Sequence, residues 1–344
     1  MIISDSNAIL SPPKVYILIL TYNGWEDTIE NLESALQQDY PNYQVVIVDN
    51  QSPNHSLDYI QQWAEGRLDV WTPPRSPLCH LITPRLPKPV PYDLLTAVDL
   101  SHRSPGQLTK PLTLIQAGTN GGFAAGNNLF LKFVVQEDAY VWLLNPDMLV
   151  ERNALSQLVS HAQSTRKDAV IGCVIRDYLT PSKLLTYGGG KNNPLSGTIT
   201  VIQDQRQSNQ LDYIHGGALF THLDNFRRIG LLPEEYFLYS EDVDWGYQAK
   251  LAGMTMEVCE SAVGYDKVST SIGTGPWAEY FYTRNALMFY KKYYSRFVPI
   301  ILGFNVLRVA KRLFNLETGR ARAVMNASRD FILSRSGKMH SRTS

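Results

Sequence analysis

The stretch KVYILILTYNGWEDTIENLESALQQDYPNYQVVIVD, residues 14 to 49, decides the fold. It begins and ends with runs rich in apolar and β-branched residues, the composition of buried strands. Between these runs, Ile29, Leu32 and Leu36 recur at the spacing of one helical face. A strand, a helix and a second strand in this order predict a parallel sheet with helices packed on it.

The same alternation continues along the first half of the chain. Further strands are predicted at 112–116 and 140–145, with a helix around 129–134. We therefore expect an α/β protein with a Rossmann-like, mostly parallel sheet and helices on both faces. Beyond residue 150 strand and helix patterns are mixed, and we expect this half to complete a ligand site at the carboxyl ends of the first strands.

Residues 67 to 111 interrupt the alternation. Nine of the nineteen prolines lie between Pro73 and Pro111, and neither a helical nor a strand period is visible there. We expect an inserted surface segment without regular structure. It could be a lid, a docking loop or a passive excursion.

The charge of the chain is divided unevenly. Residues 280–344 carry 13 basic and 2 acidic side chains, whereas residues 1–279 carry 19 basic and 30 acidic ones. This division predicts a catalytic body, 1–279, and a basic helical extension, 280–344, that meets an anionic surface. Within the extension, Arg308, Lys311 and Arg312 would form the basic face of an interfacial helix, with membrane contact through 296–314. Nucleic acid is not expected as a partner, because no binding module accompanies the charge.

Three features of the sequence indicate where in the cell the protein is located. The three cysteines are widely spaced and form no metal-binding pair, and the first residues show no signal peptide. The apolar run 297–314 is too short and too basic to cross a bilayer. We expect a cytoplasmic protein that is peripheral on the inner face of the cell membrane.

Polar side chains follow three of the predicted strands. They are Thr21 and Asn23 after the first, Asp49 after the second, and Asn145 and Asp147 after 140–145. Because strand ends converge in such a sheet, these groups would share one cleft. There Asp49 could accept a hydrogen bond from the imide N–H of a uracil or thymine ring, and Asp147 could bind a divalent cation. The alternative is that each caps a helix or forms an Asx turn.

Two further stretches could carry chemistry. GTNGGFAAGNN at 118–128 is neither a dinucleotide fingerprint nor a Walker loop, but its small residues would let Asn120 and Gly122 approach a nucleotide. In YFLYSEDVDWGYQAKLAG at 236–253, Glu241, Asp242 and Asp244 begin a helix. Because Asp242 and Asp244 are about 200° apart around that helix, at most one faces a given site. The cluster offers one carboxylate for proton abstraction and two for orientation or pairing, unless it only complements the helix dipole.

Taken together, the chain resembles a family 2 glycosyltransferase of the GT-A fold, in its rhamnosyltransferase-like branch. The resemblance extends from about Lys14 to Tyr290 and rests on an ordered set of short motifs. These are ILTYNG, VVIVDNQS, NGGFAAGNN, LLNPD, HGGALF, FLYSEDVDWGYQAKLAG and DKVSTSIG. Each motif is short, but the order and spacing of the set are specific.

The resemblance implies roles for individual residues. Thr21, Asn23 and Asp49 would bind the nucleotide, Gly216 and Gly217 would line the sugar pocket beside His215, and Asp242 would be the catalytic base. Glu241 and Asn145 would contact the substrate. Asp147 would hold Mg²⁺ or Mn²⁺, although the first acid of the metal motif is Asn145 here. Asp266 stands where the family commonly has a metal-binding His, and is either a ligand or the ion-pair partner of Lys267.

The function that the resemblance implies is inverting transfer of a sugar from a dTDP- or UDP-sugar to a lipid-linked or polysaccharide acceptor. Rhamnose is favoured by analogy alone. One alternative is a sugar nucleotidyltransferase, although LTYNGWED after the first strand lacks the basic signature loop of that class. Another is an inactive protein that binds nucleotide sugars.

Overall fold

The computed structural model describes residues 11–70, 76–268 and 275–333. Four stretches singled out in the sequence therefore lie partly outside the described residues. They are the N-terminal segment, the Pro-rich segment at 71–75, the DKVSTSIG motif from residue 269, and the basic extension from residue 334.

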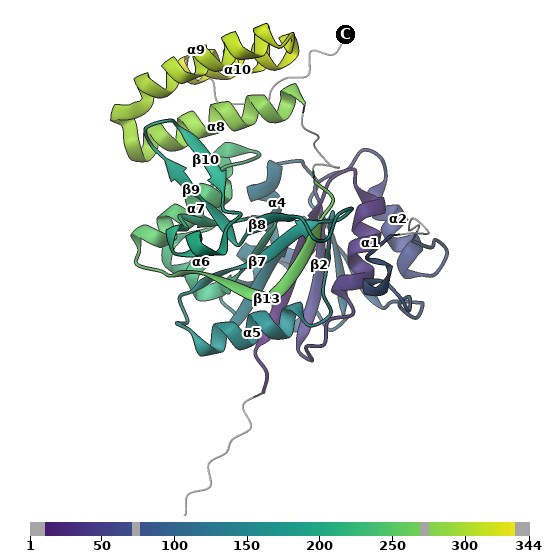
Figure 1. Cartoon of the computed structure of the whole chain (residues 1–344). Coiled ribbons are helices and arrows are strands. Elements are labelled where there is room, and N and C mark those ends of the chain that lie inside the picture. Colours follow the sequence, from purple (N-terminus) through teal and green to yellow (C-terminus); the bar gives the residue numbers. More distant parts are fainter. Residues whose placement is uncertain (1–10, 71–75, 269–274, 334–344) are drawn as a thin grey trace, which may run out of the picture.

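A ten-stranded sheet forms the centre of the molecule (Figure 1). Its order is β3-β4-β2-β1-β5-β12-β7-β13-β6, and β8 pairs with β7. The strands are β1 (Lys14–Thr21), β2 (Tyr43–Asp49), β3 (Tyr92–Thr96), β4 (Leu112–Gln116), β5 (Ala139–Leu144), β6 (Met148–Val150), β7 (Val170–Asp177), β8 (Leu184–Tyr187), β12 (Ala218–His222) and β13 (Met256–Asp266). The run from β3 to β5 is parallel, whereas β12 is antiparallel to both of its neighbours. The mostly parallel sheet is confirmed.

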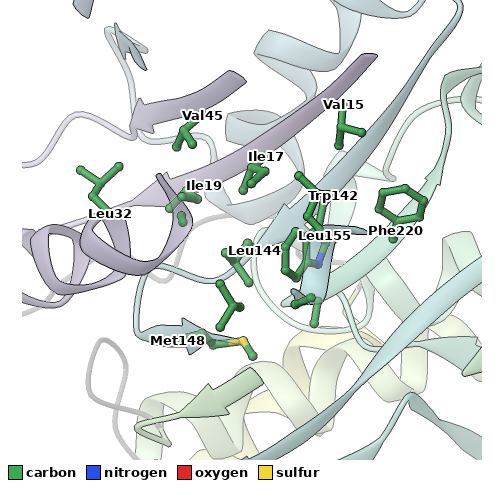
Figure 2. Close-up of a cluster of buried hydrophobic side chains, with 14 of the residues drawn as sticks. Val15, Ile17, Ile19, Leu32, Val45, Trp142, Leu144, Met148, Leu155 and Phe220 are labelled. Carbon is green, nitrogen blue, oxygen red and sulfur yellow. The ribbon is translucent and has the colours of Figure 1, made fainter. Parts of the chain in front are cut away.

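Helices cover both faces of this sheet, as predicted. They are α1 (Trp25–Ala35), α2 (Ser56–Ala64), α3 (Ala97–Ser101), α4 (Gly122–Val134), α5 (Ala154–Ser164), α6 (Leu223–Ile229) and α7 (Glu241–Leu251). Side chains alternate along β1, so that Ile17 and Ile19 pack with α1, α2 and α5, while Tyr16 and Leu18 pack with α4 and α6. Figure 2 shows the first of these layers, in which Trp142 lies between β1 and β12.

The prediction that 67–111 lacks regular structure is wrong at residues 92–101. Residues 92–96 form β3, which pairs in parallel with β4 at the edge of the sheet, and residues 97–101 form α3. The strand has only Leu95 buried, so its sequence shows no apolar run to reveal it. The segment before it is held by the buried Glu33 of α1, which accepts from the Leu86 N–H at 2.8 Å.

The second half adds a small sheet and a layer of helices. The strands β9 (Gly189–Asn193), β10 (Thr198–Val201) and β11 (Tyr213–Ile214) form the antiparallel order β10-β9-β11. The helices α8 (Pro276–Tyr294), α9 (Val298–Phe314) and α10 (Thr318–Ile332) form a layer at one end of the molecule (Figure 1). The predicted C-terminal helical extension is thus present. Among the described helices, none has the length and apolar character needed to cross a membrane.

Candidate active site

The polar strand ends predicted to share one cleft lie side by side. The register of the parallel strands sets Thr21 opposite Asp49, and Asp49 opposite Gln116. The end of β5 adjoins β1, with Leu144 opposite Ile19, so Asn145 and Asp147 follow at the same edge. This edge carries the candidate site.

Asp49 is buried and its carboxylate is held by Ser52. The Ser52 N–H donates to Oδ2 at 3.2 Å and its hydroxyl donates to Oδ1 at 2.5 Å. Burial raises the pKa of Asp49, and the two bonds from Ser52 oppose that rise. The Ser52 hydroxyl oxygen also accepts from the N–H of Asn23, which is exposed. Asp49 therefore does form an Asx-type turn, and that turn ties it to Asn23.

Thr21 is not on the surface of the cleft. It has no exposed surface, and its hydroxyl lies 2.8 Å from that of Thr28. The Thr28 hydroxyl in turn donates to the carbonyl of Gly24. A fully buried side chain cannot contact a bound nucleotide, so Thr21 holds the loop between β1 and α1 instead.

Asn120 and Gly122 join the strand ends to the loop before α7. Asn50 donates to Asn120 Oδ1 at 2.9 Å, and the same oxygen accepts from the Gly122 N–H at 3.0 Å. Gly122 has a φ of +87°, and a Cβ there would lie 2.0 Å from the carbonyl oxygen of Phe237. Only glycine permits this close approach. Asn120 and Gly122, both predicted to bind substrate, thus hold the loop after β4 against the segment before α7.

The two glycines after His215 each leave room for one site residue. A Cβ on Gly216 would lie 2.9 Å from Asp242 Cβ, and a Cβ on Gly217 would lie 2.5 Å from Asn145 Nδ2. Backbone bonds fix both pairs, because the Gly216 N–H donates to Asp242 Oδ2 at 2.8 Å and the Asn145 N–H donates to the Gly217 carbonyl at 2.9 Å. The glycine turn therefore brings Asp242 to the end of β5.

The three acids at the start of α7 have separate environments. Asp242 is partly exposed, and its second oxygen, Oδ1, accepts from the Val243 N–H at 2.8 Å. Glu241 is buried, and burial together with the charge of Asp242 raises its pKa well above the usual range. Asp244 is fully buried and points away, because it accepts from Tyr236, Tyr293 and Lys292. Of Asp242 and Asp244, only Asp242 is directed to the glycine turn, as the helix geometry predicted.

The segment before α7 has an unusual backbone. Three non-glycine residues have φ values in the left-handed region: Phe237 (67°), Tyr239 (66°) and Ser240 (75°). Such conformations are costly and persist only where other contacts hold them. Asn285 of α8 supplies those contacts, because its Nδ2 donates to three backbone carbonyls. They are those of Tyr236 (3.0 Å), Leu238 (2.6 Å) and Tyr239 (2.9 Å).

Sequence reasoning missed Asn285. It is fully buried in α8, and no local pattern marks it, since its partners lie more than 40 residues earlier. The same segment places Tyr239 beside the site. Burial, and then the charges of Glu241 and Asp147, raise the pKa of its hydroxyl.

Asp147 and Asp266 lie at adjoining strand ends. The pairing of β6 with β13 sets Asp266 opposite Met148, and the Lys267 N–H donates to the carbonyl oxygen of Asp147 at 3.2 Å. Burial raises the pKa of Asp266, while a bond from the Val268 N–H and the nearby His215 oppose that rise. Carboxylates such as those of Asp147 and Asp266 are oxygen donors of the kind that Mg²⁺ and Mn²⁺ prefer.

The ion pair weighed as the alternative for Asp266 does not form. The Lys267 ammonium instead pairs with two carboxylates of α1, Asp27 at 2.5 Å and Glu30. Lys267 thereby ties the end of β13 to α1, and the carboxylate of Asp266 accepts instead from the Val268 N–H.

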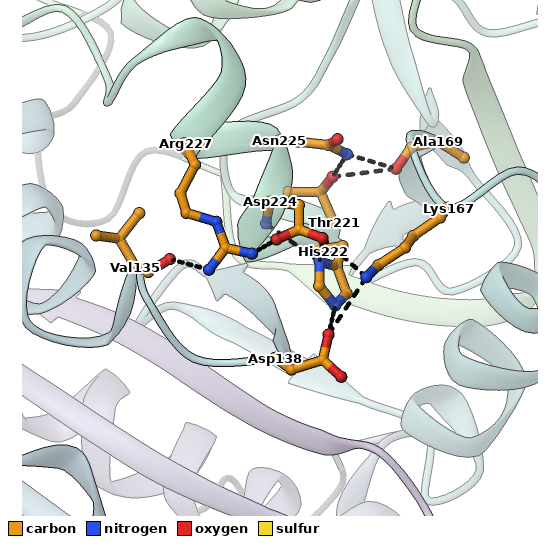
Figure 3. A network of polar contacts seen from close by, with 9 residues as sticks. All are labelled: Val135, Asp138, Lys167, Ala169, Thr221, His222, Asp224, Asn225 and Arg227. Carbon is orange, nitrogen blue, oxygen red and sulfur yellow. Dashed lines mark hydrogen bonds and ion pairs between the residues drawn. The ribbon is translucent and has the colours of Figure 1, made fainter.

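A second acidic group lies at the other end of the sheet (Figure 3). Within the described ranges, Asp138, His222 and Asp224 form the one group of three potential metal ligands that lie close together. Its charges are already balanced, because Lys167 lies 2.8 Å from Asp224 and 3.3 Å from Asp138, and Arg227 also pairs with Asp224. Burial, and then the charge of Lys167, lower the pKa of His222 to about 4. We interpret this group as an ion-pair network that holds α6 to the start of β5.

Comparison with known proteins identifies the family of the chain. Residues 16–77 and 101–221, more than half of the chain, match the model of Glycosyl transferase family 2. Over 155 residues the chain is 24% identical to the low-salt glycan biosynthesis hexosyltransferase Agl10 of Haloferax volcanii, covering 42% of this chain and 48% of that protein. Over 151 residues it is 25% identical to the rhamnosyltransferase WbbL of Escherichia coli K12, covering 39% and 56%. The chain spans about half the length of these relatives.

The fold is similar to that of solved enzymes. The mannosyltransferase PcManGT of Pyrobaculum calidifontis, solved in complex with GDP-Man and Mn²⁺, superposes with a TM-score of 0.56 at 14% identity. The superposition covers 95% of this chain and 89% of that one. The likeness confirms the predicted GT-A fold.

Proposed function

Because this chain belongs to glycosyl transferase family 2, we propose that it moves a sugar from a nucleoside-diphosphate donor to an acceptor hydroxyl with inversion, and that Asp242 is the base. One observation carries this proposal. The Asp242 carboxylate is fixed by the backbone N–H groups of Gly216 and Val243 and is brought to the strand ends where a donor would lie.

The chemistry explains why one oriented carboxylate is needed. A neutral hydroxyl is a weak nucleophile, and loss of its proton to a carboxylate during attack lowers the barrier. The proton would pass to Asp242 as the acceptor oxygen attacks the anomeric carbon from the face opposite the leaving diphosphate. The two N–H donors hold the carboxylate in one orientation, so little reorganisation is required at the moment of attack.

Glu241 would assist in a different way. Its raised pKa keeps it protonated near neutral pH, and a protonated carboxyl group can donate a hydrogen bond to a sugar hydroxyl. Asn23 and Asp49 would contact the nucleotide. Thr21, Asn120 and Gly122 would support these contacts through the loops that they hold.

Asp147 and Asp266 would hold a divalent cation, with Asn145 beside them. When bound, such a cation neutralises the charge that develops on the departing diphosphate. PcManGT, solved with Mn²⁺ and a nucleotide sugar, supports this part of the proposal by analogy of fold.

The donor would be a dTDP- or UDP-sugar, with rhamnose favoured by the likeness to a rhamnosyltransferase. The acceptor would be a lipid-linked or polysaccharide glycan. We place the reaction at the cytoplasmic face of the cell membrane, with peripheral contact through 296–314.

Release of nucleoside diphosphate from candidate donors, with a crude glycolipid extract as acceptor, tests this function. Asp242→Asn should lower turnover by about 10²–10⁴-fold, because the base is lost, while nucleotide binding by calorimetry persists. Asp204→Asn, which removes a partly exposed carboxylate paired with Arg206, is the control and should turn over normally. Undiminished turnover in Asp242→Asn would refute the assignment. Release of pyrophosphate in a parallel assay with a nucleoside triphosphate and a sugar 1-phosphate would indicate a nucleotidyltransferase, and no release in either assay a binding protein.

A further inference from the structure

The helix α9 is attached to the body by its arginines. Arg308 lies 2.8 Å and Arg312 3.1 Å from the carboxylate of Glu279 in α8, and Arg312 also pairs with Glu317. The prediction that Arg308, Lys311 and Arg312 form a basic face toward a membrane is therefore wrong for the two arginines, whereas Lys311 is exposed. Both guanidinium groups instead form ion pairs with Glu279, on the side of α9 that contacts α8.

A second side of α9 is apolar and exposed. Ile300, Phe304, Leu307 and Phe314 follow one another at helical spacing, and Leu307 and Phe314 are 64% and 89% exposed. On α10, Met325 and Ile332 continue this surface. An apolar groove lined by Val306, Val309 and Met325 runs between the two helices. We call these exposed side chains the α9–α10 face.

An apolar surface of this extent marks an interaction site in a protein that otherwise buries its core. Basic side chains are interspersed in it. Lys311 lies on the exposed stripe of α9, and the exposed Arg322 lies one turn before Met325 on α10. Arg329, between Met325 and Ile332, pairs with Asp330. The chain from residue 280 carries 13 basic and 2 acidic side chains, in contrast to the acidic body.

We propose that the α9–α10 face docks on the surface of an anionic lipid bilayer. Apolar side chains would enter the boundary of the acyl region, and the lysine and arginine side chains beside them would meet lipid phosphates. This partner satisfies both properties of the surface. A second copy of the chain would bring two sets of basic side chains together.

The docking also orients the proposed active site. α8 lies between the α9–α10 face and the body, and it holds the segment that leads to Asp242 (Figure 1). Tyr282 of α8 is close enough for the charge of Asp242 to add to the effect of burial in raising its pKa. The benefit of this orientation for a lipid-linked acceptor rests on the proposed function, whereas the docking itself does not.

Flotation of the full-length chain with lipid vesicles tests the docking without any need for turnover. The probes are vesicles of an equal mixture of phosphatidylglycerol and phosphatidylcholine, and vesicles of phosphatidylcholine alone. The wild-type chain should float with the anionic vesicles, less so with the neutral ones and less so at high salt. Leu307→Ser with Phe314→Ser should lower vesicle partition about ten-fold or more, because two apolar side chains no longer leave water.

The matched control is Leu179→Ser, which alters an equally exposed leucine on the body and should float like the wild type. Three results would overturn the proposal. The first is no flotation with anionic vesicles at low salt. The second is flotation of the double variant equal to that of the wild type, which would indicate attraction by charge alone. The third is a lipid-free dimer, detected by sedimentation, that the double variant abolishes.

Discussion

At the scale of single residues, the candidate site depends on the absence of side chains at two glycines. Asp242 and Asn145 occupy the volume that side chains at Gly216 and Gly217 would need. The catalytic role proposed for Asp242 thus requires a particular residue 26 positions earlier, in another element. This dependence can be tested without altering the carboxylate itself.

Gly216→Ala should displace Asp242 without removing it. The added Cβ would lie 2.9 Å from Asp242 Cβ and 3.3 Å from its Oδ2, so the carboxylate must shift. A misplaced base of this kind costs about 10²-fold in turnover. We expect turnover to fall by that order while nucleotide affinity by calorimetry is retained. The control is Gly106→Ala, where a Cβ meets nothing within 4 Å. Equal turnover in both variants would mean that Asp242 is not positioned by the turn.

Glu241 should make stability depend on pH. Burial and the charge of Asp242 raise its pKa above the ordinary value of 4.5, so the folded chain holds a proton that the unfolded chain releases. Stability is therefore lost as pH rises from about 4.5 through the raised pKa. Glu241→Gln mimics the protonated form, and its free energy of unfolding, from denaturant titrations between about pH 5 and pH 9, should fall less with pH. Glu235→Gln, an exposed carboxyl nearby, should keep the wild-type slope.

At the scale of elements, the sequence predicts those strands and helices whose buried positions carry apolar side chains. The strands β1, β2, β4 and β5 are buried on both faces, and such strands appear as continuous apolar runs. Because strand register fixes which residues leave the sheet together, Asp49 and Asp147 could be assigned to one edge. An edge strand such as β3 has little buried surface, and its sequence carries no comparable signal.

Two parts of the site could not be predicted, because they depend on distant contacts. The residues with left-handed backbone before α7 are not glycines, so the sequence does not indicate this conformation. It is held by a side chain from α8. The orientation of α9 follows from Glu279, which pairs with residues 29 and 33 positions later. Helical periodicity shows that a basic and an apolar side exist, but it does not show which side packs inward.

Asn285 should matter for turnover as well as for folding. In Asn285→Ala, the carbonyls of Tyr236, Leu238 and Tyr239 lose their donor, and a lost buried hydrogen bond costs about 1–3 kcal/mol. The released segment would no longer hold α7 in place, so turnover should fall further than donor affinity. Thermal unfolding, calorimetry and diphosphate release measure the three effects. Asn315→Ala, at an exposed asparagine after α9, is the control. A loss of stability with unchanged turnover would limit Asn285 to a structural role.

At the scale of the whole molecule, the basic layer and the acidic body are joined through α8. One side of α8 holds the segment before the base, and its Phe289 and Tyr290 pack with Tyr213 and Val243 of the body. Its Tyr280 and Phe281 pack against alanines of α10. The layer is thus continuous with the candidate site, and its loss should have consequences beyond the loss of membrane contact.

Removal of α9 and α10, in a chain that ends at residue 297, should therefore impair the body. Ala323 and Ala327 of α10 would no longer cover Tyr280 and Phe281, and Phe281 also stacks on Phe237 of the segment before α7, with ring centroids 5.6 Å apart. Uncovering large aromatic side chains costs about 1.5–3 kcal/mol for each one that becomes exposed. We expect a lower unfolding temperature and lower turnover, as well as loss of vesicle binding. The exposed-face variant Leu307→Ser with Phe314→Ser should lose vesicle binding and keep the unfolding temperature of the wild type. If the shortened chain instead unfolds and turns over like the full-length protein, α9 and α10 are an independent appendage, and the site is complete without them.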